Sequence, residues 1–137
     1  MKTPEIILTS LDLQRLQRLL ETHAAGRDHE AIEYLDAELA RAHVVLPCQV
    51  PSTVVTMNTR FRFIDRHSGE SHTATLVYPP KADSRHGRLS VLAPVGCALL
   101  GLGVGQTIDW PMPQGRVRTL GVAEILYQPE AAGQFEL

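Results

Sequence analysis

A chain of 137 residues is long enough for one ordinary domain, or for one small domain with an extension. Its 44% hydrophobic and 20% charged residues are typical of a folded protein and exclude an intrinsically disordered one. A formal net charge of −2 argues against a protein that binds DNA by neutralising phosphates, and an aromatic content of 5% argues against stacking platforms for single-stranded nucleic acid.

The N-terminal segment is too poor in apolar residues for an export signal. Its apolar run is only Ile6 to Leu8, and no run in the chain approaches the roughly 18 apolar residues of a membrane span. We therefore expect a cytoplasmic protein that does not enter membranes. Cys48 and Cys97 form no CxxC motif, so in a reducing compartment we expect two packed thiols rather than a disulfide.

Two amphipathic helices are predicted within residues 10–43. The first follows a capping residue, Thr9 or Ser10, and ends near His23. Its apolar face consists of Leu13, Leu16, Leu19 and Leu20, and that of the second helix consists of Ile32, Leu35, Leu39 and Ala42. The short connection predicts an antiparallel helical hairpin, a short coiled coil about 21–24 Å long at 1.5 Å per residue. Because such a hairpin buries little apolar area, it should be stable only when it packs against the rest of the chain or against a partner.

After the prolines of residues 47–51, the apolar period changes from that of helices to that of strands. Strands are predicted at residues 54–57, 60–64, 71–78, 89–93, 107–110 and 117–127, with a short helix at 95–100. The predicted fold class is therefore α+β. Residues 1–46 form a helical hairpin domain, residues 47–51 a linker, and residues 52–137 an antiparallel sheet with one short helix.

No motif in the chain predicts catalysis, and we expect no cofactor and no bound metal. The glycines at 101, 103 and 105 are not followed by the Lys-Ser/Thr of a phosphate-binding loop, so they are interpreted as a turn. The six histidines lack the spacing of zinc ligands.

The tip of the hairpin is acidic. Asp28, Glu30 and Glu33 lie within six residues, and Asp36 follows on the same predicted helix. Residues 1–50 carry five Lys/Arg and eight Asp/Glu, a net charge of −3. Carboxylates on a rigid finger can hold a magnesium ion in another protein's active site. Helix capping and the helix dipole explain Asp28 and Glu30 without a metal, and both interpretations stay open at this point.

Several ordered segments of the C-terminal half resemble a known domain. Residues 54–60 (VVTMNTR), 75–79 (TLVYP) and 90–101 (SVLAPVGCALLG) are similar to the C-terminal domain of the bacterial Gre transcript-cleavage factors. Residues 110–113 (WPMP) and 127–133 (YQPEAAG) resemble the Rnk family in particular. The resemblance implies an FKBP-like fold that serves as a binding module and not as an enzyme.

The resemblance also implies a partner. In Gre factors the hairpin enters the secondary channel of RNA polymerase, where acidic tip residues help the polymerase cleave backtracked RNA. Rnk proteins have a shorter hairpin and compete with Gre factors without stimulating cleavage. We therefore expect a monomeric, non-catalytic regulator that binds RNA polymerase near this channel, does not recognise DNA sequence, and influences nucleoside diphosphate kinase levels indirectly. The expected contacts are Asp28, Glu30, Glu33 and Asp36 at the tip, and Pro94, Val95, Leu99 and Leu100 in the C-terminal domain.

Two other functions stay open. One is an active Gre-like factor that stimulates cleavage through its acidic tip, and the other is direct action on nucleoside diphosphate kinase, which no residue here supports. Asp28 and Glu30 are two residues apart, so on a helix they point about 200° apart and are not expected to chelate one ion together. The short hairpin should also fall short of the polymerase active site, which favours the regulator.

Overall fold

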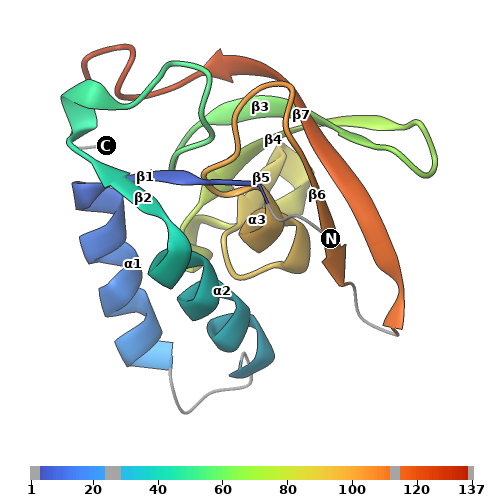
Figure 1. The fold of residues 1–137 in the computed structure, drawn as a ribbon, viewed down its shortest axis with the longest axis horizontal. Coiled ribbons are helices and arrows are strands. Elements are labelled where there is room, and N and C mark those ends of the chain that lie inside the picture. Colours follow the sequence, from blue (N-terminus) through green and yellow to red (C-terminus); the bar gives the residue numbers. More distant parts are fainter. Residues whose placement is uncertain (1–3, 24–28, 112–114, 136–137) are drawn as a thin grey trace.

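The computed structural model describes residues 4–23, 29–111 and 115–135, so the predicted tip residue Asp28 lies outside the described residues. The helices are α1 (Ser10–His23), α2 (His29–Arg41) and α3 (Pro94–Leu99), with 3-10 turns at Pro47–Gln49, Pro79–Lys81 and Ser84–His86. The strands are β1 (Ile7–Thr9), β2 (His43–Val45), β3 (Arg60–Asp65), β4 (Ser71–Val77), β5 (Arg88–Ser90), β6 (Thr107–Pro111) and β7 (Val117–Tyr127). Figure 1 shows α1 and α2 side by side next to a curled sheet, with α3 inside the curl.

The two predicted helices are confirmed. Thr9 precedes α1, and its Oγ1 accepts a hydrogen bond from the backbone N–H of Asp12 at 3.0 Å, as a capping residue does. Leu16 and Leu35, one from each predicted apolar face, are fully buried. Within the described residues, no helix is both long and apolar enough to cross a membrane. The description of the pair as a coiled coil stays a prediction.

The predicted α+β class is confirmed, but the sheet is mixed rather than antiparallel. Within the described residues its strand order is β5-β4-β3-β7-β6, and β5 runs parallel to β4, with Thr75 opposite Arg88. The prediction of an antiparallel sheet is therefore wrong at this edge. Pro79 and Pro80 follow β4 and form a 3-10 turn, so the chain leaves the sheet before it returns as β5. The FKBP-like detail stays a prediction.

One predicted strand needs correction, and two short strands were not predicted. Residues 54–57 do not form a regular strand; instead Val55 bonds through its backbone to Gly101 and Leu102, at 2.8 Å in both cases. In the segments before and after the helices, β1 and β2 pair in parallel, with Leu8 opposite Val44. These three-residue strands were missed because their pairing joins segments far apart in sequence and leaves no local periodicity.

The helices and the sheet share one hydrophobic core. Leu16 and Leu35 from the helices belong to the same buried cluster as Phe61 and Trp110 from the sheet. The ring of Tyr34 on α2 lies 5.5 Å from the ring of Trp110 on β6, centroid to centroid. The predicted domain boundaries are not tested by this observation, but the hairpin clearly gains its burial from the sheet.

The tightest contact between the two parts is at Gly101. The backbone N–H of Ile7 donates to the carbonyl oxygen of Gly101 at 3.1 Å. Gly101 has a φ of +80°, and a Cβ at this position would lie 2.8 Å from the Cβ of Ile6. Only glycine meets both requirements, because it adopts positive φ freely and has no side chain to collide with β1.

A carboxylate is buried at the same junction. Asp12 is only 4% exposed, and its Oδ2 accepts the backbone N–H of Met57 at 3.1 Å. Burial raises the pKa of Asp12 from 3.8 to about 7, against the opposing effect of the Met57 hydrogen bond, and the negative charge of Glu130 raises it further.

The crowding at Gly101 predicts a specific loss of stability. Gly101→Ala should lower the free energy of unfolding by about 2 kcal/mol or more beyond the loss in Gly105→Ala. Gly105 also has a positive φ, of +89°, but a Cβ there would meet nothing within 4 Å. The stability loss in Gly105→Ala therefore measures the backbone strain without a steric collision. Urea unfolding of both variants measures the difference. Equal losses in the two variants would show that packing against β1 is unimportant.

The raised pKa of Asp12 predicts a pH-dependent stability. Between about pH 4 and pH 7 the folded protein holds a proton that the unfolded chain releases, so stability falls progressively over this range and levels off above pH 7. The stability of Asp12→Asn relative to the unaltered protein should therefore be about 3 kcal/mol greater at pH 8 than at pH 5. Urea unfolding at both pH values measures this, with Asp36→Asn on the exposed surface of α2 as the control. A constant difference between Asp12→Asn and the unaltered protein would contradict the assignment.

Candidate functional site

The start of α3 is fixed by local sequence. Pro94 occupies the first helical turn, where its missing N–H is not needed, and Ala93 before it is extended, with φ −68° and ψ 147°. Gly96 faces the end of β5, where a Cβ would lie 2.1 Å from the carbonyl oxygen of Ser90. Glycine therefore allows α3 to pack directly onto the end of β5, and this contact sets the position of Val95.

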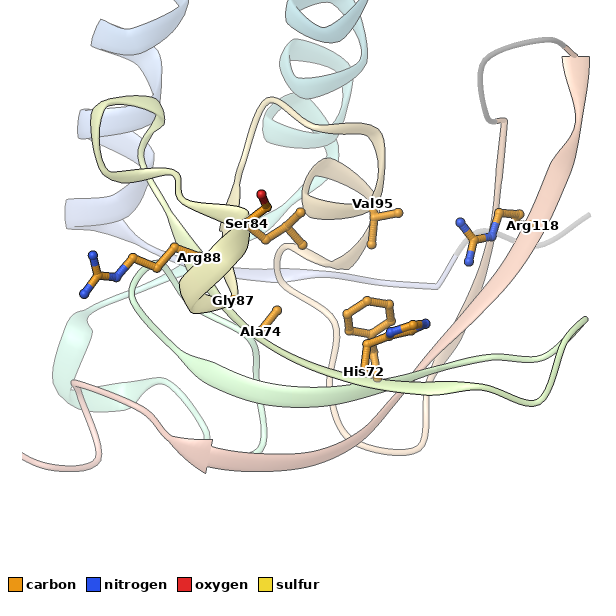
Figure 2. Close-up of a pocket in the computed structure, with 9 residues that line it drawn as sticks. His72, Ala74, Ser84, Gly87, Arg88, Val95 and Arg118 are labelled. Carbon is orange, nitrogen blue, oxygen red and sulfur yellow. The ribbon is translucent and has the colours of Figure 1, made fainter.

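A pocket of about 290 Å³ lies between Val95 and the inner face of the sheet. Its apolar lining comes from Phe63 on β3, Ala74 on β4 and Leu89 on β5. The His72 ring lies 5.4 Å from the ring of Phe63, and Figure 2 shows His72 beneath Val95. A pocket of this size and lining is suited to one apolar side chain of a partner.

Arg118 forms the charged rim of this pocket. Its Nε donates to Oδ2 of Asp65 at 2.7 Å, and its Nη2 donates to the same oxygen. Asp65 is 5% exposed; this burial by itself raises its pKa, but the backbone N–H of His67 and the Arg118 guanidinium outweigh it and hold the pKa below its ordinary value. The ionised carboxylate therefore holds Arg118 at the rim, on the side of the pocket opposite Arg88 in Figure 2.

The structure separates the four expected contacts of the C-terminal domain into two pairs. Pro94 and Val95 are half-buried at the surface, and Val95 lines the pocket. Leu99 and Leu100 are fully buried in the core, so these two have no surface to offer a partner in this conformation. They face inward because α3 lies inside the curl of the sheet, where its second half contacts the core on all sides.

The acidic residues of the hairpin lie on α2. Glu30, Glu33 and Asp36 are exposed and follow each other at three-residue spacing, while Asp28 lies outside the described residues. Figure 1 places the first residues of α2 at the end of the helix pair away from β1 and β2. Glu38 on the same helix differs from them, because it is 6% exposed and accepts two hydrogen bonds from Arg41, at 3.0 and 2.7 Å.

The arrangement offers little for catalysis. Among the described residues, no group of three or more His, Cys, Asp or Glu side chains is placed to hold a metal ion. Burial, with a smaller effect of Glu38, raises the pKa of the Cys97 thiol to about 12, so it is no nucleophile at neutral pH. Cys48 is exposed, which corrects the expectation that both cysteines are packed.

Sequence reasoning missed the sheet side of the pocket. The strand period predicted for residues 60–64 is confirmed, because buried and more exposed residues alternate along β3 and Phe63 is one of the buried residues. No spacing in the sequence, however, indicates that His72, Leu89 and Arg118 meet beside Val95. The sequence pointed to this site only through Pro94 and Val95, which lie in the segment that resembles the Gre C-terminal domain.

Comparison with known proteins is consistent with the resemblance seen in the sequence. Residues 4–45 match the family model described as Rnk N-terminus, and residues 50–127 match the model described as transcription elongation factor, GreA/GreB, C-term. The chain is 47% identical to the regulator of nucleoside diphosphate kinase of Escherichia coli K12 over the full length of both proteins.

The chain belongs to the Rnk family. It also carries the GreA/GreB C-terminal domain, and is 36% identical to transcription elongation factor GreA of Thermodesulfovibrio yellowstonii over 68% of this chain and 61% of that protein. Among solved structures, a GreA/GreB-type elongation factor from Nitrosomonas europaea is 47% identical, with a TM-score of 0.70 over 90% of this chain and 99% of that one. The Rnk assignment predicted from the sequence is thus confirmed.

Proposed function

We propose that this Rnk-family protein is a non-catalytic transcription regulator that binds RNA polymerase near its secondary channel and competes there with Gre-type factors. One observation carries the proposal: a single chain joins a GreA/GreB C-terminal domain to a pair of helices of only 14 and 13 residues. Its relative in Escherichia coli is named a regulator of nucleoside diphosphate kinase. An effect on that kinase would be indirect, through transcription, and the protein would act as a cytoplasmic monomer.

The C-terminal domain would anchor the protein on the polymerase. The surface around Pro94 and Val95 supports this role, because it offers an apolar pocket with a fixed cation, Arg118, at its rim. An apolar centre with a polar rim suits an interface of modest size, in which one inserted side chain supplies much of the binding energy.

The helix pair would occlude the channel rather than assist cleavage. At 1.5 Å per residue, helices of 14 and 13 residues span about 21 and 20 Å. A carboxylate ligates magnesium only at about 2.1 Å, so a shortfall of a few ångströms abolishes ligation whatever residues stand at the tip. The exposed Glu30, Glu33 and Asp36 would instead be attracted to a basic channel lining, an attraction that salt weakens.

Filling the pocket beside α3 should weaken binding to the polymerase. Val95→Arg should reduce the amount of bacterial RNA polymerase captured by the immobilised full-length protein by about tenfold or more, because the arginine would occupy the space that a buried partner side chain needs. Val104→Arg is the matched control, since Val104 is 42% exposed and lies in the turn outside the pocket. Capture of polymerase that is equal for Val95→Arg and Val104→Arg, with both folded by circular dichroism, would contradict the proposal.

A cleavage assay on backtracked elongation complexes tests the role of the helices. The protein alone should give no shortened transcripts, and in excess over GreA it should suppress GreA-stimulated cleavage. The double variant Glu30→Lys with Glu33→Lys should need several-fold more protein for the same suppression, because it reverses the charge attracted to the channel.

The control for this assay is Glu5→Lys with Glu124→Lys, which makes the same charge change at exposed positions outside α2 and outside the pocket beside α3. It should suppress cleavage as the unaltered protein does. The contrary outcome is that the protein alone shortens the transcripts and the Asp28→Ala variant does not. That result would show that the hairpin reaches the active site and that the protein is an active Gre-like factor.

A further inference from the structure

A second hollow, of about 820 Å³, lies on the outer face of the sheet and shares only Arg88 with the lining of the pocket beside α3. Its lining includes Arg60, Thr75 and Arg88, which alternate along their strands with the residues that face α3. The polar part of the wall also includes Lys81, on the 3-10 turn after β4, and Tyr127, at the end of β7, together with Asn58 and Asp83. In Figure 2 the guanidinium of Arg88 points away from the pocket beside α3.

Strand register places these side chains in one row across the sheet. Tyr127 lies opposite Arg60, Arg60 opposite Thr75, and Thr75 opposite Arg88. Neighbouring strands are about 4.8 Å apart, so the two arginines are separated by about 10 Å with only the small Thr75 between them. The row from Tyr127 to Arg88 is about 14 Å long.

A register shift in β7 places Tyr127 at the end of this row. Phe61 pairs with Ile125, so uninterrupted pairing would put Leu126 opposite Arg60. The shift between Arg60 and Phe61 brings Tyr127 to that position instead. Bulges of this kind often re-aim a side chain at a functional site.

Two of the three cations of the hollow have no acidic partner. Among the described residues, neither Arg60 nor Lys81 forms an ion pair, whereas Arg62 on the same face is 3.6 Å from Glu124. The carboxylate in the lining is Asp83, which lies 2.7 Å from Nδ1 of His86; this hydrogen bond and, to a smaller extent, the positive charge of Arg88 lower the pKa of Asp83, so Arg88 is partly neutralised. Cations held close together on one sheet face repel each other, and a bound anion would relieve that repulsion.

We propose that this hollow binds a nucleoside polyphosphate. Its phosphates lie between Arg60, Arg88 and Lys81, with the Thr75 hydroxyl as an additional donor, and its base stacks on Tyr127. Arginine and lysine are the side chains that bind phosphate oxygens, and an aromatic ring accepts any base on its face. The site would let a soluble nucleotide influence a transcription regulator, but its existence does not depend on the binding of polymerase.

The length and the charge of the site favour a free nucleotide over its alternatives. A row of about 14 Å exceeds the size of a single inorganic phosphate. A nucleic acid chain would need basic residues well beyond these three, whereas the net charge of the whole protein is −2.

Isothermal titration calorimetry of the full-length protein at low salt tests the proposal. ATP should bind saturably with one site per chain, inorganic tripolyphosphate more weakly, and adenosine not measurably. The double variant Arg60→Ala with Arg88→Ala should weaken ATP binding by about tenfold or more, because it removes charge-assisted hydrogen bonds to phosphate. Tyr127→Ala should weaken ATP binding several-fold while leaving tripolyphosphate binding unchanged.

Arg62→Ala is the matched control, because it removes an arginine of the same strand and face that is already paired with Glu124; it should bind ATP as the unaltered protein does. Amide chemical shifts of the unaltered protein, followed by NMR during titration with ATP, should move at the residues of the row and give a test independent of any variant. No saturable binding of ATP at millimolar concentration, binding unaffected by the double variant, or tighter binding of a single-stranded RNA than of ATP would overturn the proposal.

Discussion

The contact between the N-terminal segment and the glycine turn after α3 is the one on which the rest of this structure depends. Helices of 14 and 13 residues cannot bury enough apolar surface against each other to be stable alone. At Gly101 the chain comes close enough to Ile6 for a backbone hydrogen bond to β1, and the leucines of α1 and α2 then enter the core of the sheet. The helix pair is therefore held by the C-terminal part of the chain.

This dependence has a consequence for function. A hairpin that shares the core of the sheet cannot swing freely, so its acidic surface has a fixed relation to the pocket beside α3. Docking of the pocket on a partner would then also set the position of Glu30, Glu33 and Asp36. The buried Asp12, whose carboxylate accepts the Met57 N–H across the same junction, is part of that rigid connection.

The two faces of the sheet differ in chemistry because strand alternation separates them. Phe63, Ala74 and Leu89 face α3 and leave an apolar pocket there, while Arg60 and Arg88 face outward. A ligand on the outer face would touch the same strands, β3 to β5, whose inner side chains line the docking pocket. The proposed nucleotide site and the proposed polymerase contact thus lie back to back on one sheet.

The sequence by itself determined the α+β class, the bounds of the helices to within one or two residues and the alternation of β3, because these depend on local periodicity and capping residues. It also determined the Rnk family, because the family's motifs occur in order along the chain. Only the tertiary structure decided which residues of α3 and of the segment after it reach the surface. Leu99 and Leu100 fit a docking motif in sequence but lie in the core, since α3 sits inside the curl of the sheet. The parallel pairs β1–β2 and β4–β5, and the pocket that both His72 and Arg118 line, bring together residues distant along the chain. Such contacts depend on how the whole chain packs, and no local pattern encodes them.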